Sequence, residues 1–190
     1  MYKIPTRYLR TISVPFVLVT LLWGLNVSAQ NWRKADTSPL DMSYFKLSRD
    51  GAPIARVIYS RPEKKGRLIF GKLVQYNKLW RTGANEAAEI TFYQDVSLAG
   101  KAVKAGSYSL FTVPQKDQWT IILSTKLHQW GSYSHQESDE VLRVDVPIKK
   151  SAEVIERFSI TFDSNDSGAN MYLGWDQVMV AVPLAGAFKK

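Results

Sequence analysis

Branched or aromatic apolar residues recur at every second position in three stretches of this chain, and this period of two constrains the fold more than any other feature of the sequence. The stretches are residues 142–148, 158–162 and 178–182. A period of two places every second side chain on one face of an extended strand, whereas an amphipathic helix needs spacings of three and four. Four further stretches are rich in the β-branched and aromatic residues that fit a pleated sheet, namely 54–59, 88–93, 108–113 and 119–123. The sequence therefore predicts at least seven strands.

Residues that favour turns separate the predicted strands at short intervals. Ala99-Gly100-Lys101, Lys104-Ala105-Gly106 and residues 114–117 suit tight turns, so the chain is expected to form consecutive hairpins in this region. Closely spaced strands with such turns are typical of an antiparallel all-β fold, and we predict a β-sandwich that is jelly-roll-like or related. One short helix is expected near residues 68–80, where apolar residues recur at spacings of three and four, although Gly71 weakens this prediction.

The N-terminal segment has the composition of a secretory signal peptide. Lys3, Arg7 and Arg10 precede an apolar run at residues 12–25, and Val27-Ser28-Ala29 provides small residues before a cleavage point. The apolar run is shorter than the roughly 20 residues that a membrane-spanning helix needs. We therefore expect cleavage after Ala29 and no stable membrane anchor in the mature protein.

The chain contains no cysteine. This excludes thiolate catalysis, cysteine-ligated metal sites and disulfide bonds, as well as acylation at the cleavage site. Small secreted domains of eukaryotes usually carry disulfides, so a periplasmic or secreted bacterial protein is favoured. We predict a signal peptide at 1–29, a flexible lead at 30–39 and a single β-sandwich domain at 40–190.

A distinctive run of residues lies at 59–92, with the sequence YSRPEKKGRLIFGKLVQYNKLWRTGANEAAEITF. Shorter motifs follow: AGSYSLFTVP at 105–114, QWTIILS at 118–124, HQWGSY at 128–133 and VLRVDVP at 141–147. Together they resemble a bacterial family of exported proteins named domain of unknown function 2911. The resemblance covers most of the mature chain. It implies an exported bacterial protein and carries no established activity with it.

Positive charge is concentrated in one segment. The whole chain has 25 Lys and Arg against 17 Asp and Glu, a formal charge of +8. Between Arg61 and Arg81 there are several bases and a single acid, Glu63. A field of this kind attracts phosphate, carboxylated sugars or anionic lipid head groups, and no nucleic-acid partner is expected for an exported protein. The alternative is a solvated face that contacts only water. We call this segment the basic patch; its members are Arg61, Lys64, Lys65, Arg67, Lys72, Lys78 and Arg81.

The strongest candidate site is the segment at residues 80–86, WRTGANE. A turn centred on glycine could present a guanidinium, an amide and a carboxylate beside an indole that serves as a stacking platform for a sugar. The alternative is a structural loop, with an ion pair between Arg81 and Glu86 and with Asn85 stabilising the turn. The candidate ligand-binding residues are Trp80, Arg81, Asn85, Glu86, Arg61 and Arg67.

The sequence gives little support for a metal site, a nucleotide-binding site or a catalytic nucleophile. His128 and His135 are seven residues apart and match no zinc-ligand spacing. Residues 163–168 resemble the opening of a calcium loop, but Gly174 stands where a bidentate glutamate is needed, so we predict an Asx-rich hairpin turn. No phosphate loop, dinucleotide fingerprint or nucleophile elbow occurs. The sequence predicts neither a metal nor a cofactor.

Two main functions remain, and the first is favoured. It is a non-catalytic exported module that binds a glycan or another anionic ligand through the candidate residues. The second is a small hydrolase in which Glu86 pairs with Asp139 or Asp176, as two carboxylates do in glycoside hydrolysis. A third is a structural partner in an envelope assembly that uses an exposed sheet edge.

Export gives the first testable prediction. The full chain, expressed in a Gram-negative host, is expected to appear in the periplasm or medium with Gln30 as its first residue, because small residues precede that position. Intact-mass spectrometry checks this, and Ala29→Leu should accumulate the uncleaved precursor. A protein that keeps residues 1–29 would contradict the prediction.

Overall fold

The computed structural model describes residues 30–188. The predicted signal peptide lies outside the described residues. From Ala35 onward the chain groups into one compact unit, which contains all the strands. None of the helical segments within the described part has the length and hydropathy to cross a membrane.

The fold is all-β and antiparallel, which confirms the predicted fold class. The only helical element assigned in residues 30–188 is a single 3-10 turn, Glu137–Asp139. The strands are β1 (Leu40–Lys46), β2 (Pro53–Ser60), β3 (Ala88–Phe92), β4 (Val96–Leu98), β5 (Lys101–Val103), β6 (Gly106–Pro114), β7 (Gln118–Ser124), β8 (Glu140–Asn165) and β9 (Gly168–Ala185).

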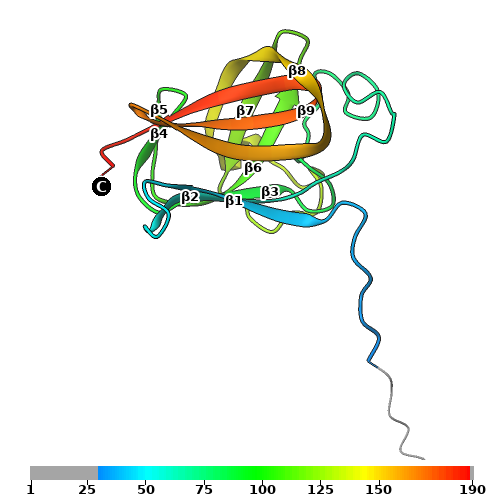
Figure 1. The fold of residues 1–190 in the computed structure, drawn as a ribbon, viewed down its shortest axis with the longest axis horizontal. Helices are drawn as coiled ribbons and strands as arrows, with labels where there is room; N and C mark the ends of the chain where they lie inside the picture. The colour runs from blue at the N-terminus through cyan, green and yellow to red at the C-terminus, as the bar shows by residue number, and fades with distance from the viewer. Residues whose placement is uncertain (1–29, 189–190) are drawn as a thin grey trace, which may run out of the picture. The chain divides into compact units, whose positions relative to one another are not determined.

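The strands pair in the order β1-β2-β3-β6-β7-β8-β9-β4-β5. β8 joins two parts of this sheet, because it pairs with β7 through residues 140–147 and with β9 through residues 148–165. Its pairing with β9 shifts register between Lys150 and Ile155 and again before Ser159. Such irregularities bend a strand. β8 accordingly curves, and β9, β4 and β5 pack over the layer that contains β1, β2 and β3 (Figure 1).

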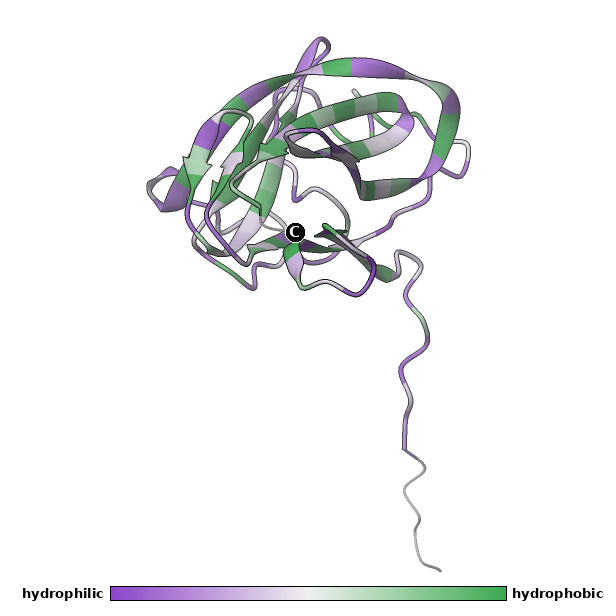
Figure 2. Ribbon diagram, turned by 60° about the vertical axis from the view of Figure 1, so that its left-hand side comes forward, coloured by the Kyte–Doolittle hydropathy of each residue, from purple (hydrophilic) through white to green (hydrophobic). Residues whose placement is uncertain are grey.

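Aromatic contacts connect the two layers. Phe45 in β1 stacks on Phe162 in β8 with ring centroids 6.2 Å apart, and Tyr59 in β2 meets Phe158 in β8 edge-on at 5.7 Å. The Tyr59 hydroxyl also donates a hydrogen bond of 3.1 Å to the carbonyl of Ile160. Apolar and polar residues alternate along the strands, as the bands of colour in Figure 2 show. The alternating residues of the sequence thus supply the core between the layers.

The predicted turns also form. Ala99 and Gly100 have φ angles of 48° and 78° and connect β4 to β5. At the β8–β9 turn the amide of Ser167 donates to the side-chain oxygen of Asn165 at 2.9 Å. This is the Asx turn expected from the sequence, in which a side chain takes the place of a backbone acceptor.

The prediction of a short helix near residues 68–80 is wrong. This segment consists of turns and isolated bridges, and Gly71 and Asn77 have φ angles of 87° and 59°, outside the helical region. Its first half closes on itself in a turn, where Val74 donates to Ile69, and its second half bonds to β6, where Asn77 donates to Pro114 and Trp80 donates to Thr112. The loop buries only some of the apolar residues at this spacing, since Ile69 and Trp80 are buried whereas Leu68 and Leu73 are exposed.

The core contacts give a prediction for stability. Phe158 is fully buried between Tyr59 and Trp80, so Phe158→Ala is expected to lower the free energy of unfolding by about 3–5 kcal/mol. Urea unfolding measures this. Val154 lies on the same strand with an exposed side chain, and Val154→Ala should change the free energy by less than about 0.5 kcal/mol. Equal effects of the two variants would contradict the layer packing.

Candidate functional site

The predicted site segment forms a loop whose two ends are held against the sheet. Trp80 exchanges two backbone hydrogen bonds with Thr112 in β6, of 2.8 and 3.0 Å. The amide of Ala88, the first residue of β3, donates to the carbonyl of Arg81 at 3.0 Å and closes the loop. Residues 81–87 therefore form an excursion between two fixed points. We call this segment the 81–87 loop.

A second loop fixes the far side of the 81–87 loop. The amide of Gly131 donates to the carbonyl of Asn85 at 3.0 Å, and the amide of Ala87 donates to the carbonyl of Gln129 at 2.8 Å. Because both sides of the loop are bonded to neighbouring backbone, its side chains are presented from a rigid support.

Three residues of the loop have positive φ angles: Thr82 at 58°, Gly83 at 153° and Asn85 at 59°. For a β-branched residue such as Thr82 this is a rare and strained conformation. Thr82 is fully buried, and its hydroxyl lies 3.2 Å from that of Thr112. At Gly83 a Cβ atom would lie 2.8 Å from the carbonyl oxygen of Ser60, so only glycine fits. Strain of this kind is concentrated at functional sites.

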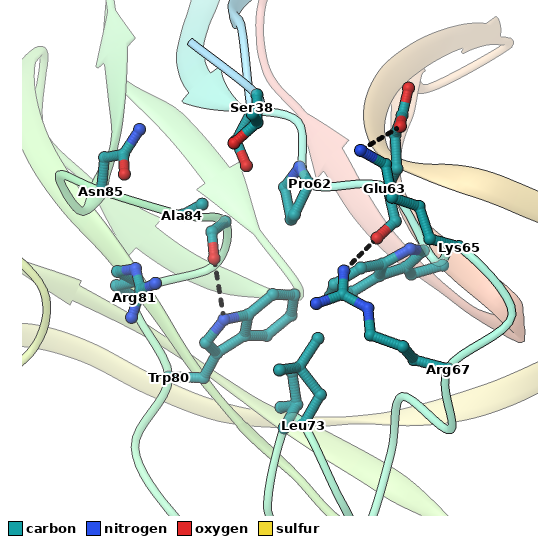
Figure 3. Close-up of a pocket in the computed structure, with 14 residues that line it drawn as sticks. Ser38, Pro62, Glu63, Lys65, Arg67, Leu73, Trp80, Arg81, Ala84 and Asn85 are labelled. Atoms are coloured by element: carbon teal, nitrogen blue, oxygen red, sulfur yellow. Dashed lines mark hydrogen bonds and ion pairs between the residues drawn. The ribbon is translucent and has the colours of Figure 1, made fainter.

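A pocket with a volume of about 530 Å³ lies beside the 81–87 loop (Figure 3). We call it the Arg81 pocket. Its walls come from residues 37–38 before β1, from residues 62–67, from the turn at 73–74, from Trp80 and the 81–87 loop, and from β9. The lining residues are Thr37, Ser38, Pro62, Glu63, Lys65, Arg67, Leu73, Val74, Trp80, Arg81, Gly83, Ala84, Asn85 and Trp175.

Trp80 forms part of the pocket floor. Its indole N–H donates to the carbonyl of Gly83 at 3.0 Å, and its ring stacks on Trp175 with centroids 6.0 Å apart. Phe158 and Trp119 pack against it at 4.9 and 5.9 Å. Only 8% of Trp80 is exposed, so its ring is a component of the core that shows one small part to the pocket.

Arg81 lines the pocket without a counterion. Its Nε is buried and has no hydrogen-bond partner, and no carboxylate among residues 30–188 forms an ion pair with its guanidinium. Glu86, its expected partner in the structural alternative, is exposed and does not line the pocket; its backbone forms a bridge with Trp130. A buried donor that has lost water and gained no acceptor costs free energy.

The opposite wall of the pocket carries two more cations and one carboxylate. Glu63 accepts from Arg157 at 2.6 and 2.8 Å and lies 3.2 Å from the ammonium of Lys65. The hydrogen bonds from Lys65 and Arg157 lower the pKa of Glu63 below its usual value, so it is ionised at neutral pH and compensated. Arg67 donates through Nε to the carbonyl of Lys64 at 2.9 Å and through Nη2 to the carbonyl of Glu63.

Acidic residues from other strands pair with two members of the basic patch, Arg61 and Lys64. Arg61 donates to Asp41 at 2.8 Å, to the hydroxyl of Ser159 at 2.7 Å and to the carbonyl of Phe158 at 3.1 Å, and it does not line the pocket. Lys64 lies 3.5 Å from Asp176.

Of the predicted site residues, Trp80, Arg81, Asn85 and Arg67 therefore meet at the Arg81 pocket, whereas Glu86 and Arg61 lie outside it. The pocket also uses residues that sequence reasoning did not select, among them Pro62, Leu73 and Ser38. No local pattern marks them, because the turns that bring them together are set by long-range backbone bonds.

A family model described as a protein of unknown function, DUF2911, matches residues 43–184. The chain belongs to the DUF2911 family. This confirms the resemblance seen in the sequence. Neither a curated protein nor a solved structure matches the chain. The DUF2911 region includes every lining residue of the pocket except Thr37 and Ser38, and since the family has no established activity, function must be argued from the site itself.

The strained loop of this DUF2911 protein gives a second stability prediction. Gly83→Ala is expected to be more destabilising than Gly100→Ala by at least about 1 kcal/mol. Both positions have positive φ, but an added Cβ meets backbone at Gly83 and open space at Gly100. Urea unfolding of the two variants compares them directly. Equal losses would show that the 81–87 loop can relax away from Ser60.

Proposed function

We propose that this protein is a non-catalytic, exported bacterial module whose Arg81 pocket binds a small ligand through an anionic group. The observation that carries the proposal is Arg81 itself, which lines the pocket and has no counterion in the described part of the chain. Its Nε is buried, but its Nη groups are not, so an incoming carboxylate or phosphate can accept two hydrogen bonds from them.

The size and charge of the pocket support the proposal. Its volume falls within the range of about 300–1,000 Å³ that is usual for small-molecule sites. Three cationic side chains line it, from Lys65, Arg67 and Arg81, against the single carboxylate of Glu63, which Lys65 and Arg157 already compensate. The lining therefore carries excess positive charge.

The packing of Trp80 favours an anionic group over a neutral sugar. A sugar that stacks on an indole needs an accessible ring face, and the ring of Trp80 is packed against Trp175, Trp119 and Phe158. A glycan ligand would therefore depend on a carboxylate, sulfate or phosphate substituent for its affinity.

The hydrolase alternative receives less support. Glu86 lies outside the pocket, and Asp176 is engaged by Lys64. Paired carboxylates in glycosidases flank the bond that is cleaved, and the pocket lining offers only Glu63. Binding without catalysis thus accounts better for the charges that face the pocket.

Binding of simple anions tests this proposal. The purified mature protein is expected to bind at least one of benzoate, glucuronate and phenyl phosphate, and to bind the uncharged analogues benzamide, glucose and phenol at least about tenfold more weakly, because a charge-assisted bond is lost. Perturbation of the Trp80 indole N–H signal in NMR titrations reports occupancy of this pocket. Arg81→Gln should abolish the perturbation, and Arg81→Lys should restore it only in part.

The control is Lys78→Gln, which removes one positive charge from the basic patch at an exposed position outside the pocket lining. It should leave the affinity for the anions within about twofold at moderate ionic strength. The proposal fails if charged and uncharged probes bind equally, or if Arg81→Gln folds normally and retains wild-type affinity.

A further inference from the structure

We propose that the ligand of the Arg81 pocket carries two anionic groups, one at each end of an apolar or aromatic middle. This inference rests on the proposed function and narrows the ligand class. It arises from the placement of cations on two opposite walls, with apolar side chains between them.

The first anionic group would bind at Arg81. This guanidinium is presented by the rigid, strained 81–87 loop and lines the pocket without a counterion among residues 30–188, so its Nη groups have donors left for an anion. Asn85 lines the pocket from the same loop and adds an amide that can donate to a second oxygen of the same group.

The second anionic group would bind at the wall that carries Arg67 and Lys65. Arg67 uses Nε and Nη2 to hold the carbonyls of its own turn, so the turn fixes the guanidinium while Nη1 is without a hydrogen bond within the described chain. The Lys65 ammonium is partly satisfied by Glu63, and more than half of its side chain is exposed. Both side chains have N–H donors left for an anion.

These two ends lie on opposite sides of the Trp80 ring. Figure 3 shows Arg81 on one side of the indole and Arg67 and Lys65 on the other. A single carboxylate held by Arg81 would therefore leave Arg67 without an anion and Lys65 with only Glu63, which Arg157 shares. Like charges that face one pocket repel each other, and a ligand with two negative ends relieves this at both walls.

The surface between the cations is largely apolar, with the hydroxyl-bearing Ser38 at one rim (Figure 3). Trp80, Val74 and Ala84 are buried side chains that contribute to it, and Pro62 and the exposed side chain of Leu73 face it from the two sides (Figure 3). A hydrocarbon chain or a ring loses little by contacting these groups, whereas a polar middle would lose hydrogen bonds to water. The ligand class is therefore a bipolar dianion, such as a dicarboxylate with an apolar spacer.

The test compares each dianion with the matching monoanion. Isothermal titration calorimetry on the mature protein would use the linear dicarboxylates from succinate to sebacate, together with terephthalate, and the monomethyl ester of each. One spacer length is expected to bind about tenfold or more tightly than its ester, because a second charge-assisted bond forms only when the length fits. Shorter and longer members should approach the affinity of their esters.

Amino-acid substitutions show which residues bind each end of the ligand. Arg67→Gln and Lys65→Gln should each reduce the preference for the dianion while leaving the affinity for the ester within about threefold. Arg81→Gln should weaken both forms. Lys72→Gln is the matched control, since this exposed base of the same segment does not line the pocket, and it should preserve the preference. Thermal unfolding of each variant checks that the turn at residues 63–67 remains folded.

The outcomes separate the two proposals. If esters and dianions bind equally at every spacer length, and Arg81→Gln abolishes both, the ligand is a monoanion and only the further inference is wrong. If the preference persists in both Arg67→Gln and Lys65→Gln, the second end lies elsewhere and the inference is again wrong. If no anion of either kind binds the wild-type protein, the proposed function fails as well.

Discussion

The packing of Trp80 against the core is the interaction on which the rest of the site depends. Trp80 belongs to a loop segment, yet its ring meets Trp119 of β7, Phe158 of β8 and Trp175 of β9, so it joins the loop to strands of both layers. Aromatic contacts of this kind add free energy beyond simple burial, at about 0.5–1.5 kcal/mol per pair. Because Trp80 is fixed, the residue that follows it, Arg81, emerges at a defined point on the pocket wall. The floor of the pocket and the position of its principal cation thus have one common cause.

The free-energy costs visible at this site fall on the same short loop. A threonine in a left-handed conformation costs of order 1–3 kcal/mol, and a buried donor without an acceptor costs about as much again. Hydrogen bonds with Thr112, Gln129 and the amide of Gly131 hold the loop in place in spite of these costs. The strained backbone fixes where the Arg81 side chain enters the pocket, and the buried Nε is a cost of that placement. If the pocket binds an anion as proposed, the protein bears the cost of orienting Arg81 before the ligand arrives.

The positive charge that faces the pocket in the folded protein is smaller than the charge counted along the basic patch. The basic patch is a run of cations along the chain, but Arg61 is held by Asp41 of β1, Lys64 lies near Asp176 of β9, and Glu63 is shared by Lys65 and Arg157. Each of the two distant acids comes from another strand, so a count along the chain overstates the local field. What survives is a smaller positive region at the pocket, made by the cations that retain free donors. A ligand would meet this remaining charge, and not the total formal charge of the segment.

The sequence by itself determined the features that depend on near neighbours. The alternation at 142–148, 158–162 and 178–182 and the Asx turn at Asn165 each require only a few adjacent residues, and all of them form. It did not show that the first two stretches belong to one bent strand, and it wrongly indicated a helix at 68–80, where long-range backbone bonds override the local spacing. The candidate site was found in part, since a glycine-containing loop with a guanidinium is visible in the sequence, but tertiary structure alone decided that Glu86 and Arg61 lie outside the pocket while Leu73 and Trp175 line it. The reason is geometric: which side chains share a cavity is set by the curvature of β8 and by loops bonded to distant strands, and neither is encoded in the spacing of residues along the chain.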